Sequence, residues 1–258
     1  MNVNRLQEGL RTKRFGKRIV FLWKIGSTND YAKELASYGA EEGTVVIAET
    51  QTAGRGRLGR RWISPNGGLY LSIILRPKIS VVETVKLVFV ASLAVAKTLN
   101  ELYRLSAETK WPNDVLVKGK KVCGILAEAN TTGEKVNYTV IGVGVNANFN
   151  AEKALPKELA ETATSLENAL GRKIQLEELF RGLIEKLETL YHLFLKEGFT
   201  PILNEWKKYA SFLGKNVEVA NGTEKTHGIA VDIDSDGSLV LKQNDGSIKL
   251  VSGDLSLN

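Results

Sequence analysis

The pattern of apolar and polar residues predicts an alternation of strands and helices in the first half of the chain. Three short runs are rich in β-branched, aromatic and other apolar residues, which is typical of buried strands. These runs span residues 18–26, 43–49 and 67–77. After the first run, Ser27 with Asp30 three residues later is a capping-box-like signal for a helix that ends near Gly39. Apolar residues at helical spacing predict a long, largely buried helix over residues 81–103.

The second half of the chain contains further strand and helix patterns, and its last part changes in character. A turn at 112–114, a hairpin with its tip at 118–120 and a turn at 131–135 lead into a strand at 136–149. Two helices are expected at 176–196 and 199–209. From Gly214 onward, short alternating strands are separated by Asn-Gly and Asp-Gly turn signals at 221–222, 236–237 and 245–246. We therefore place a domain boundary near Ser211, which gives a larger unit at 1–210 and a small β-barrel or roll at 211–258.

The strand at 136–149 has an unusual distribution of small residues. Alternation along the strand puts Gly142, Gly144 and Asn146 on the same face as Val140. Glycine weakens a strand unless another backbone or a ligand must come close. This face therefore either packs tightly against a helix or supports a ligand that lies across the sheet.

Composition and charge narrow the classes of function. Hydrophobic residues make up 43% and charged residues 25% of the 258 positions, which is ordinary for a soluble globular protein. The formal charge of +6 favours anionic partners such as nucleotides, nucleic acids or acidic proteins. The single cysteine, Cys123, excludes an intramolecular disulfide and a cysteine-based zinc site. His192 and His227 are far apart in sequence, so we expect no transition-metal site. These observations do not exclude a Mg²⁺ ion bound by carboxylates and substrate phosphates.

The sequence gives no sign of a targeting segment or a membrane span. Charges scattered through residues 1–23 leave no apolar core for a signal peptide. The most apolar uncharged run, residues 87–96, is shorter than the ~20 residues that a membrane-spanning helix needs. We therefore expect a soluble, cytoplasmic protein with no membrane partner.

The segment GRGRLGRRW, residues 54–62, is the strongest candidate for a functional loop. Its glycines allow backbone amides to approach an anion, and arginine offers a planar fork for bidentate contacts with phosphate or carboxylate. Four like charges should repel one another and keep the loop mobile until an anion neutralises them. Three interpretations are open: a loop that closes over an anionic ligand, a nucleic-acid-binding strip, or a solvated loop.

Three further groups of residues are candidates for a site. Asn113 and Asp114 offer an amide and a carboxylate after a strand, although Pro-Asn-Asp is also good turn chemistry. Lys121 is expected, from alternation, on the same face as Cys123, Ile125 and Ala127, where a lysine is unusual among apolar neighbours. Residues 27–29 either cap a helix or offer polar groups and free N–H groups to a ligand.

Six segments, taken together and in order, resemble the biotin–protein ligases (biotin–acetyl-CoA-carboxylase ligases). They are STN (27–29), AETQTAGRGRLGRRWISP (48–65), GGLYLSIILRP (67–77), KWPNDVLV (110–117), KKVCGILAE (120–128) and IGVGVN (141–146). The pairing of GRGRxGRxW with KWPND at this spacing, followed by the strand motif K…G(I/V)L(A/V)E, is specific. The resemblance extends from about Arg18 into the tail, which is similar to the family's small SH3-like domain.

The resemblance implies a fold, an activity and partners. The implied fold is α/β (α+β), with a central mixed, largely antiparallel sheet flanked by helices, as in the class II aminoacyl-tRNA synthetase-like biotin/lipoate ligases, plus a C-terminal SH3-like β-barrel. The implied activity is the formation of biotinyl-5′-AMP from biotin and ATP, and then biotin transfer to one lysine of the biotin carboxyl carrier domain of a biotin-dependent carboxylase. Mg²⁺ would be held mainly by the ATP phosphates, with Asp114 as a further ligand. The resemblance also implies a homodimer.

The same resemblance implies roles for individual residues. The implied catalytic residues are Arg55, Arg57 and Lys121. The residues implied to bind biotin are Ser27, Thr28, Asn29, Gln51, Gly54, Arg55, Gly56, Arg57, Lys121, Gly124, Gly142 and Gly144. The residues implied to bind ATP are Arg55, Arg57, Arg60, Trp62, Asn113, Asp114, Lys121 and Asn146. Alternation already places Gly142, Gly144 and Asn146 on one face, so the two lines of reasoning indicate the same ligand site.

Two other functions remain to be distinguished from biotin ligation. A lipoate–protein ligase would share the fold and the adenylate chemistry, and a nucleic-acid-binding module would use the basic loop without requiring ATP. Only 26 residues precede Ser27, too few for a helix-turn-helix domain plus the first strand. We therefore expect a ligase without the DNA-binding repressor function of bifunctional members, and no nucleic-acid partner.

Overall fold

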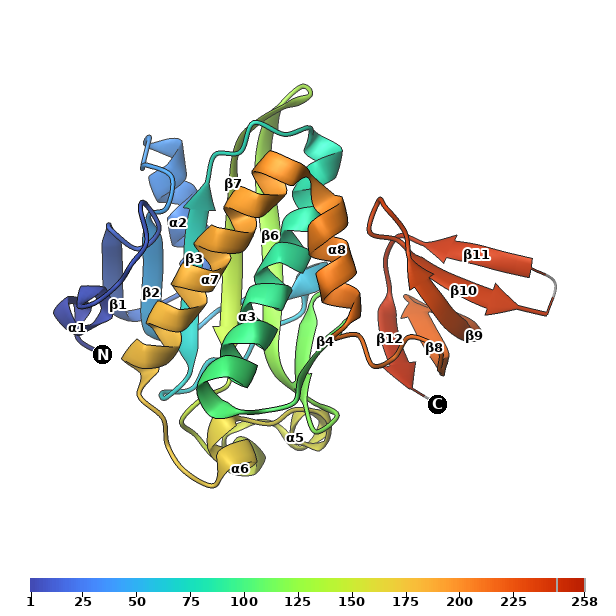
Figure 1. Ribbon diagram of the computed structural model, residues 1–258. Helices are drawn as coiled ribbons and strands as arrows, with labels where there is room; N and C mark the ends of the chain where they lie inside the picture. The colour runs from blue at the N-terminus through green and yellow to red at the C-terminus, as the bar shows by residue number, and fades with distance from the viewer. Residues whose placement is uncertain (245, 258) are drawn as a thin grey trace.

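A seven-stranded sheet with the order β1-β2-β3-β7-β6-β5-β4 forms the centre of the molecule (Figure 1). The computed structural model describes residues 1–244 and 246–257. The strands are β1 (Ile19–Ile25), β2 (Val45–Gln51), β3 (Leu69–Leu75), β4 (Ala107–Lys110), β5 (Asp114–Val117), β6 (Lys120–Thr132) and β7 (Lys135–Val145). β1 and β2 run parallel, and the other neighbouring strands run antiparallel. The predicted mixed, largely antiparallel sheet is thus confirmed.

Helices cover both faces of this sheet. Figure 1 shows α3 (Leu87–Tyr103) and α7 (Leu176–Glu197) crossing one face, with α8 (Phe199–Lys207) beside them. α2 (Thr28–Ser37) packs on the other face against β2, β3 and β7. The short helices are α1 (Val3–Gln7), α4 (Ala151–Ala154), α5 (Lys157–Thr162) and α6 (Leu166–Leu170), with 3₁₀ turns η1 (Arg57–Gly59) and η2 (Val81–Lys86). Because both faces are covered, every residue of β3 is buried, which explains its continuous apolar sequence.

Local sequence signals account for most of these elements. Ser27 caps α2, its hydroxyl accepting a hydrogen bond from the backbone N–H of Asp30 at 3.4 Å. The helix predicted over residues 81–103 is present, but its first turn is the 3₁₀ segment η2. Strand β4 is the strand expected before Asn113, for which the sequence pattern indicated no bounds. It is four residues long and alternates only between buried and half-buried positions.

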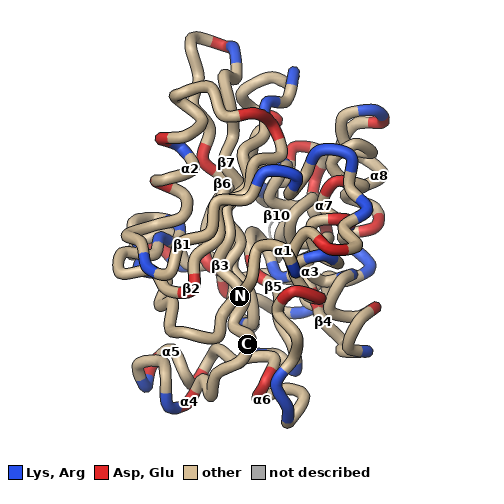
Figure 2. Tube along the Cα trace, turned by 90° about the vertical axis from the view of Figure 1, so that its left-hand side faces the viewer, with Lys and Arg blue, Asp and Glu red and all other residues tan. Residues whose placement is uncertain are grey.

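The main core lies between the sheet and the layer formed by α3, α7 and α8. Its largest fully buried side chains include Trp111, Trp206 and Tyr191. A second, smaller core lies beneath α2, where Ala32 and Ala36 pack against Val46, Ile74 and Val140. The outer side of the helical layer carries charges of both signs on α7 and α8 (Figure 2), as expected for a solvated surface.

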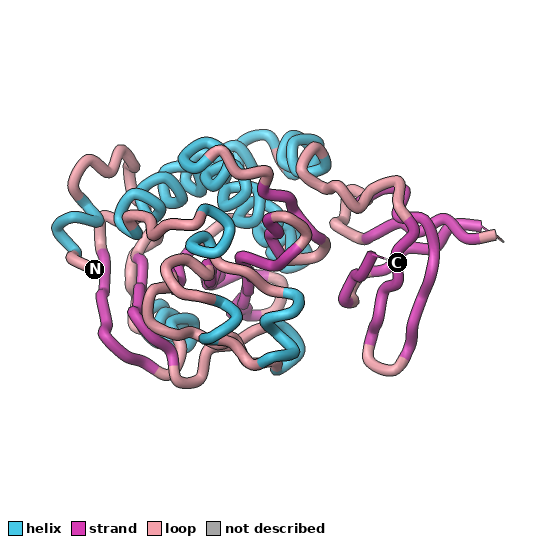
Figure 3. Tube along the Cα trace, turned by 90° about the horizontal axis from the view of Figure 1, so that it is seen from below, coloured by secondary structure: helices cyan, strands magenta, loops and turns pink. Residues whose placement is uncertain are grey.

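A second, five-stranded antiparallel sheet follows α8, with the order β11-β10-β9-β8-β12. It contains β8 (Asn216–Asn221), β9 (Glu224–Ile233), β10 (Leu239–Gln243), β11 (Gly246–Leu250) and β12 (Asp254–Leu257). Figures 1 and 3 show this sheet beside the β4 side of the molecule. The indole N–H of Trp111, next to β4, donates to the carbonyl oxygen of Gly237 at 3.0 Å and joins the two parts.

The predicted C-terminal β-unit is therefore present as an antiparallel sheet. The turn signal at 236–237 falls between β9 and β10, and the signal at 221–222 marks the end of β8 and the turn that follows it. The third signal includes Asp245, which lies outside the described residues, as does Asn258. The division at 210/211 and the SH3-like closure of the sheet stay predictions.

Candidate active site

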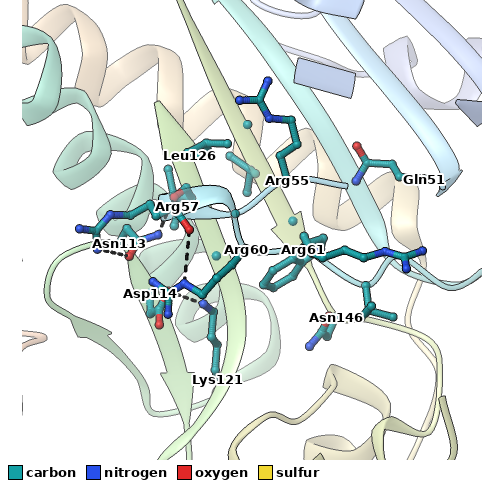
Figure 4. Close-up of a pocket in the computed structure, with 18 of the residues that line it drawn as sticks. Gln51, Arg55, Arg57, Arg60, Arg61, Asn113, Asp114, Lys121, Leu126 and Asn146 are labelled. Carbon is teal, nitrogen blue, oxygen red and sulfur yellow. Dashed lines mark hydrogen bonds and ion pairs between the residues drawn. The ribbon is translucent and has the colours of Figure 1, made fainter. Parts of the chain in front are cut away.

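The sequence-predicted site residues come together on the α2 side of the large sheet. All of them except Gly54 line one pocket, which Figure 4 shows from close up. The predicted residues in this lining are Ser27, Thr28, Asn29, Gln51, Arg55, Gly56, Arg57, Arg60, Trp62, Asn113, Asp114, Lys121, Gly124, Gly142, Gly144 and Asn146. Gly54 lies just behind the lining. A Cβ at that position would come within 2.5 Å of the carbonyl oxygen of Trp62, so Gly54 permits the two sides of the arginine loop to approach closely.

One end of the pocket is a connected set of polar side chains around the start of α2. The backbone N–H of Thr28 donates to Gln51 Oε1 at 2.8 Å, and Gln51 Nε2 donates to Ser64 Oγ at 2.9 Å. Ser72 Oγ, on β3, lies 2.8 Å from Thr28 Oγ1 and 2.6 Å from Asn29 Oδ1. This end thus presents amide and hydroxyl groups whose orientations are fixed by one another.

Glycines form the floor of the pocket. A Cβ on Gly142 would overlap Asn29 Oδ1, and a Cβ on Gly144 would lie 2.6 Å from Trp62 Nε1. A Cβ on Gly124, opposite Gly144 on β6, would lie 2.8 Å from the Trp62 ring. The predicted common face of Gly142 and Gly144 is therefore the face toward the pocket, and only glycine leaves room there for Asn29 and Trp62.

The arginine loop is a tight hairpin. Trp62 N donates to Gly54 O at 2.9 Å, and Gly56 N donates to Arg60 O at 2.7 Å. The tip turns through Leu58 at φ 55° and Gly59 at φ 72°. Leu58 adopts this left-handed conformation with its side chain largely exposed.

Protein carboxylates offset the repulsion among the loop's arginines. Arg55 lies 2.5 Å from Asp30 Oδ1 and 3.0 Å from Glu128 Oε1. Arg60 lies 2.7 Å from Asp254 Oδ1, on β12. The hydrogen bond from Arg55 to Asp30 raises the pKa of Arg55. The fold thus supplies part of the neutralisation that the sequence led us to expect from a bound anion.

Arg57 points inward from the loop and has a different environment. Its Nη1 donates to Asn113 Oδ1 at 3.2 Å (Figure 4). The same Nη1 donates to the carbonyl oxygen of Gly253 at 3.4 Å. Burial lowers the pKa of Arg57, and the nearby carboxylate of Asp254 offsets this effect only in part. The partially desolvated guanidinium is suited to bind an anion that enters the pocket.

Lys121 lies in the pocket, but the strand face predicted for it is wrong. Val115 pairs with Cys123 while the next residue, Leu116, pairs with Lys121, so β6 has one extra residue at this point. Such a bulge reverses the direction of the side chains on one side of it. Cys123 therefore faces the buried core, whereas Lys121 points into the pocket.

The ammonium group of Lys121 is held between an acid and an aromatic ring. Lys121 Nζ lies 2.6 Å from Asp114 Oδ1 and forms an ion pair with it. It also lies 5.3 Å from the centre of the Trp62 ring. These contacts fix the position of the positive charge within the pocket that Arg57 also lines.

Some parts of the pocket carried no sequence signal. Leu155, Leu159, Thr162 and Ala163, from the α4–α5 segment, form one wall. Asp254 reaches the pocket from the second sheet. Ile63 also lines it. Arg61, which belongs to the candidate loop found in the sequence, lines the pocket as well and donates to the backbone carbonyl of Thr52 at 3.0 Å.

Besides Asp114 Oδ1, which is ion-paired with Lys121, two buried polar atoms of the pocket lining have no hydrogen-bond partner within the described part of the chain. They are Trp62 Nε1 and Asn146 Oδ1. One is a donor and the other an acceptor, so a ligand that carries both kinds of group would complement them.

Among residues 1–244 and 246–257, no group of three or more His, Cys, Asp and Glu side chains has the arrangement of a metal site. In that same part of the chain, no helix combines the length and apolarity that crossing a bilayer requires.

The fold and this pocket define a protein ligase of the class that attaches biotin or lipoate. Residues 23–146 match the Biotin/lipoate A/B protein ligase family, and residues 212–257 match the Biotin protein ligase C terminal domain. The chain belongs to the biotin protein ligases within this class.

Several relatives support this assignment. The Bifunctional ligase/repressor BirA of Bacillus subtilis (strain 168) is 37% identical over the whole chain, which covers 79% of that relative. The Biotin--[acetyl-CoA-carboxylase] ligase of Paracoccus denitrificans is 34% identical, over 86% of this chain and 92% of the relative. Among solved structures, the biotin protein ligase from Aquifex aeolicus in complex with biotin and ATP has a TM-score of 0.80 at 29% identity, covering 94% of this chain and 99% of that one.

Proposed function

We propose that this one pocket activates biotin with ATP as biotinyl-5′-AMP and then transfers the biotinyl group to a lysine of a biotin carboxyl carrier domain. The observation that carries the proposal is the arrangement of the pocket. Fixed polar groups at one end, a glycine floor and two inward-pointing cations lie along a single cavity.

Biotin occupies the polar end of the pocket in this proposal. The ureido ring of biotin carries both hydrogen-bond donors and an acceptor, which matches the hydroxyl and amide groups of Ser27, Thr28, Asn29 and Gln51. The valeryl tail would run over Gly142 beneath the arginine loop, with Gly54 to Arg57 above it. Its carboxylate then reaches the region of Arg57 and Lys121.

Activation joins two anions. A carboxylate oxygen of biotin attacks the α-phosphorus of ATP, a new P–O bond forms, and the bond to pyrophosphate breaks. Arg57 and Lys121 lower the repulsion between the two anions and stabilise the charge on the phosphorus oxygens. We assign Trp62 and Asn146 to the nucleotide because they have an unpaired donor and acceptor and lie farther along β7 than Asn29, since Asn29 is over Gly142 whereas Trp62 is over Gly144.

The remaining predicted contacts complete the ATP site. Asn113 holds Arg57 in place, since its Oδ1 accepts from Arg57 and its Nδ2 donates to the backbone carbonyl of Ile125 at 2.8 Å. Arg60 lies at the mouth, where it can contact the triphosphate. Arg55 is placed nearer to biotin.

Mg²⁺ fits this pocket as an ion carried mainly by the phosphates of ATP. Asp114 supplies one carboxylate within the pocket, and Mg²⁺ commonly uses one or two protein carboxylates together with substrate phosphates. When bound, the ion would neutralise triphosphate charge and assist the departure of pyrophosphate. Asp114 would then exchange part of its contact with Lys121 for the ion.

Transfer completes the reaction. The uncharged amine of the carrier lysine attacks the acyl carbon of the mixed anhydride, the C–N bond forms, and AMP leaves. Until that point the hairpin loop shields the anhydride from water. The acceptor we propose is the carrier domain of a biotin-dependent carboxylase, and we place the enzyme in the cytoplasm as a homodimer, which light scattering on the purified protein tests.

The proposal predicts a specific defect in two variants. Lys121→Ala and Arg57→Ala should lower biotin-dependent ATP–pyrophosphate exchange by at least about a hundredfold, because each removes a charge that stabilises the transition state. Both variants should keep the wild-type melting temperature within a few degrees, since both side chains are partly exposed. Full exchange activity in Lys121→Ala would remove that residue from the mechanism.

The overall activity has a direct test. The purified protein is incubated with biotin, MgATP and a biotin carboxyl carrier domain, and the carrier is weighed by mass spectrometry. We expect the gain of one biotinyl group on one lysine. Exchange supported by lipoate and not by biotin would favour the lipoate-ligase alternative instead.

A further inference from the structure

Glu128, on β6, ends the motif KKVCGILAE but lies outside the pocket lining. Its carboxylate accepts a hydrogen bond from Asn29 Nδ2 at 2.9 Å through Oε2. Its other oxygen, Oε1, lies 3.0 Å from Lys33 Nζ and 3.0 Å from Arg55 Nη2. One side chain therefore contacts both the polar end of the pocket and the arginine loop.

The contact with Asn29 decides which end of that amide faces the pocket. A carboxylate accepts hydrogen bonds and does not donate, so the NH₂ group of Asn29 must point toward Glu128. The carbonyl oxygen Oδ1 then points the other way, toward Ser72 Oγ at 2.6 Å and over Gly142. The amide of Asn29 is buried, which makes this orientation costly to reverse.

The contact between Glu128 and Arg55 holds the beginning of the arginine loop in position. Arg55 is bound by two carboxylates, and Glu128 is the less exposed of them, with 20% of its side chain accessible against 51% for Asp30. Asp30 binds the same two cations, Arg55 and Lys33, but within the described residues its carboxylate makes no hydrogen bond to the side chain of Asn29. The two acids therefore share the charge cluster and differ in their connection to the pocket.

A continuous chain of polar contacts follows from Glu128. It runs from Arg55 through Glu128, Asn29 and Ser72 to Thr28, and from there to Gln51 and Ser64 on the far side of the loop. Both ends of the arginine hairpin are thus connected through the side chains that we assign to the ureido ring. We infer that Glu128 is a positioning residue that sets the donor–acceptor pattern offered to biotin and couples biotin binding to the placement of Arg55; the inference rests on the proposed function.

The matched pair Glu128→Gln and Asp30→Asn tests this inference. Each variant removes one negative charge from the cluster around Arg55 and Lys33 with little change in shape. Only Glu128→Gln also replaces the charged acceptor for Asn29 by a group that can donate or accept, so the orientation of the Asn29 amide then depends on the longer contact of its Nδ2 with the carbonyl oxygen of Leu126, at 3.5 Å. Biotin binding is measured by calorimetry without ATP, and kcat and the KM for ATP are measured at saturating biotin.

We expect Glu128→Gln to raise the Kd of biotin by about tenfold, since a hydrogen bond to a charged group contributes about one decade or more to an equilibrium constant. Asp30→Asn should raise it by less than about threefold, as expected for an exposed pair. The KM for ATP should stay within about twofold of wild type in both variants. Equal effects of the two variants on biotin, or no effect of Glu128→Gln, would overturn the inference.

Ser72→Ala provides a second route if Glu128→Gln folds poorly. It removes the group on the other side of Asn29 and leaves the charge cluster intact, so the Kd of biotin should again rise by several-fold. An unchanged Kd in Ser72→Ala contradicts the assigned orientation of Asn29. A wild-type protein that binds no biotin would instead count against the proposed function, so the two failures are distinguishable.

Discussion

Gly142 provides the most direct test of the pocket's geometry. It lies on β7, between Ser72 on β3 and Leu126 on β6 in the sheet register. Its backbone is not left-handed, so alanine can adopt the same conformation without backbone strain. The effect of Gly142→Ala therefore comes from the added methyl group, which would overlap Asn29 Oδ1 and lie 2.9 Å from Asn29 Cγ.

The magnitude follows from what Asn29 must give up. Asn29 is 4% exposed, and its amide is held by Ser72 on one side and Glu128 on the other. Moving it breaks at least one of these hydrogen bonds, and overpacking adds a comparable cost, so the free energy of unfolding should fall by about 2 kcal/mol. Biotin also loses a correctly placed hydrogen-bond partner. This loss should weaken the free energy of biotin binding by roughly 2–3 kcal/mol, which raises the Kd by about 30- to 150-fold.

Isothermal titration calorimetry with biotin alone measures the affinity, and thermal unfolding measures the stability. Gly26→Ala is the matched control. Gly26 precedes the same α2 terminus, has no left-handed φ, and a Cβ there meets no atom within 4 Å. If Gly142→Ala binds biotin within about twofold of the control, biotin does not depend on Asn29 and the reasoning is refuted.

Two further predictions concern contacts far from the reacting atoms. Glu188 accepts hydrogen bonds from the backbone N–H groups of Lys13, Arg14 and Phe15, which lower its pKa despite the opposing effect of burial. A lowered pKa stabilises the fold above the unfolded-state pKa of about 4.3 and loses this effect as the pH falls through the folded-state value. Glu188→Gln should therefore cost about 2 kcal/mol at pH 7, with a difference from wild type that shrinks below about pH 4; a pH-independent difference in chemical denaturation would contradict this. The pair Arg60–Asp254 is half-exposed, so a double-mutant cycle of Arg60→Ala and Asp254→Asn should give a coupling of at most about 1 kcal/mol that fades near 1 M salt. A larger coupling that resists salt would mean that the pair is desolvated.

The parts of the site that could be predicted from sequence are those fixed by local geometry. Ser27 could be recognised as the cap of α2 because capping depends on residues three positions apart. The common face of Gly142 and Gly144 followed from strand alternation, which holds along the regular part of β7. In both cases the signal and the structure that it specifies lie within one element.

The parts that could not be predicted depend on contacts between distant segments. Alternation predicted the wrong strand face for Lys121 because β6 contains a bulge at this point. A bulge depends on how a strand pairs with its neighbour, and the sequence of the strand alone does not show it. Asp254 reaches the site through the packing of the second sheet, and Leu159 through a helix in a stretch without motifs. The sequence contains these residues, but nothing near them in the chain indicates what they face.

The four arginines of the loop can be separated by the partners that the fold provides. Arg55 and Arg60 are paired with carboxylates from α2, β6 and β12, and Arg61 donates to a backbone carbonyl. Pairing anchors these groups on the two sides of the hairpin. An incoming anion would have to compete with the existing partners of Arg55 and Arg60.

Arg57 differs because its contacts are with neutral oxygens, the side-chain amide of Asn113 and the carbonyl of Gly253. Within the described residues, no carboxylate lies within ion-pair distance of it, and burial lowers its pKa because the charge is poorly solvated. A carboxylate or phosphate that enters the pocket would relieve this desolvation without displacing an existing ion pair. Lys121, by contrast, must leave or share Asp114 to do the same. Among the four arginines of the loop, Arg57 is therefore the one whose guanidinium has only neutral side-chain and backbone partners within the described residues, while Arg55 and Arg60 are ion-paired and Arg61 donates to a backbone carbonyl.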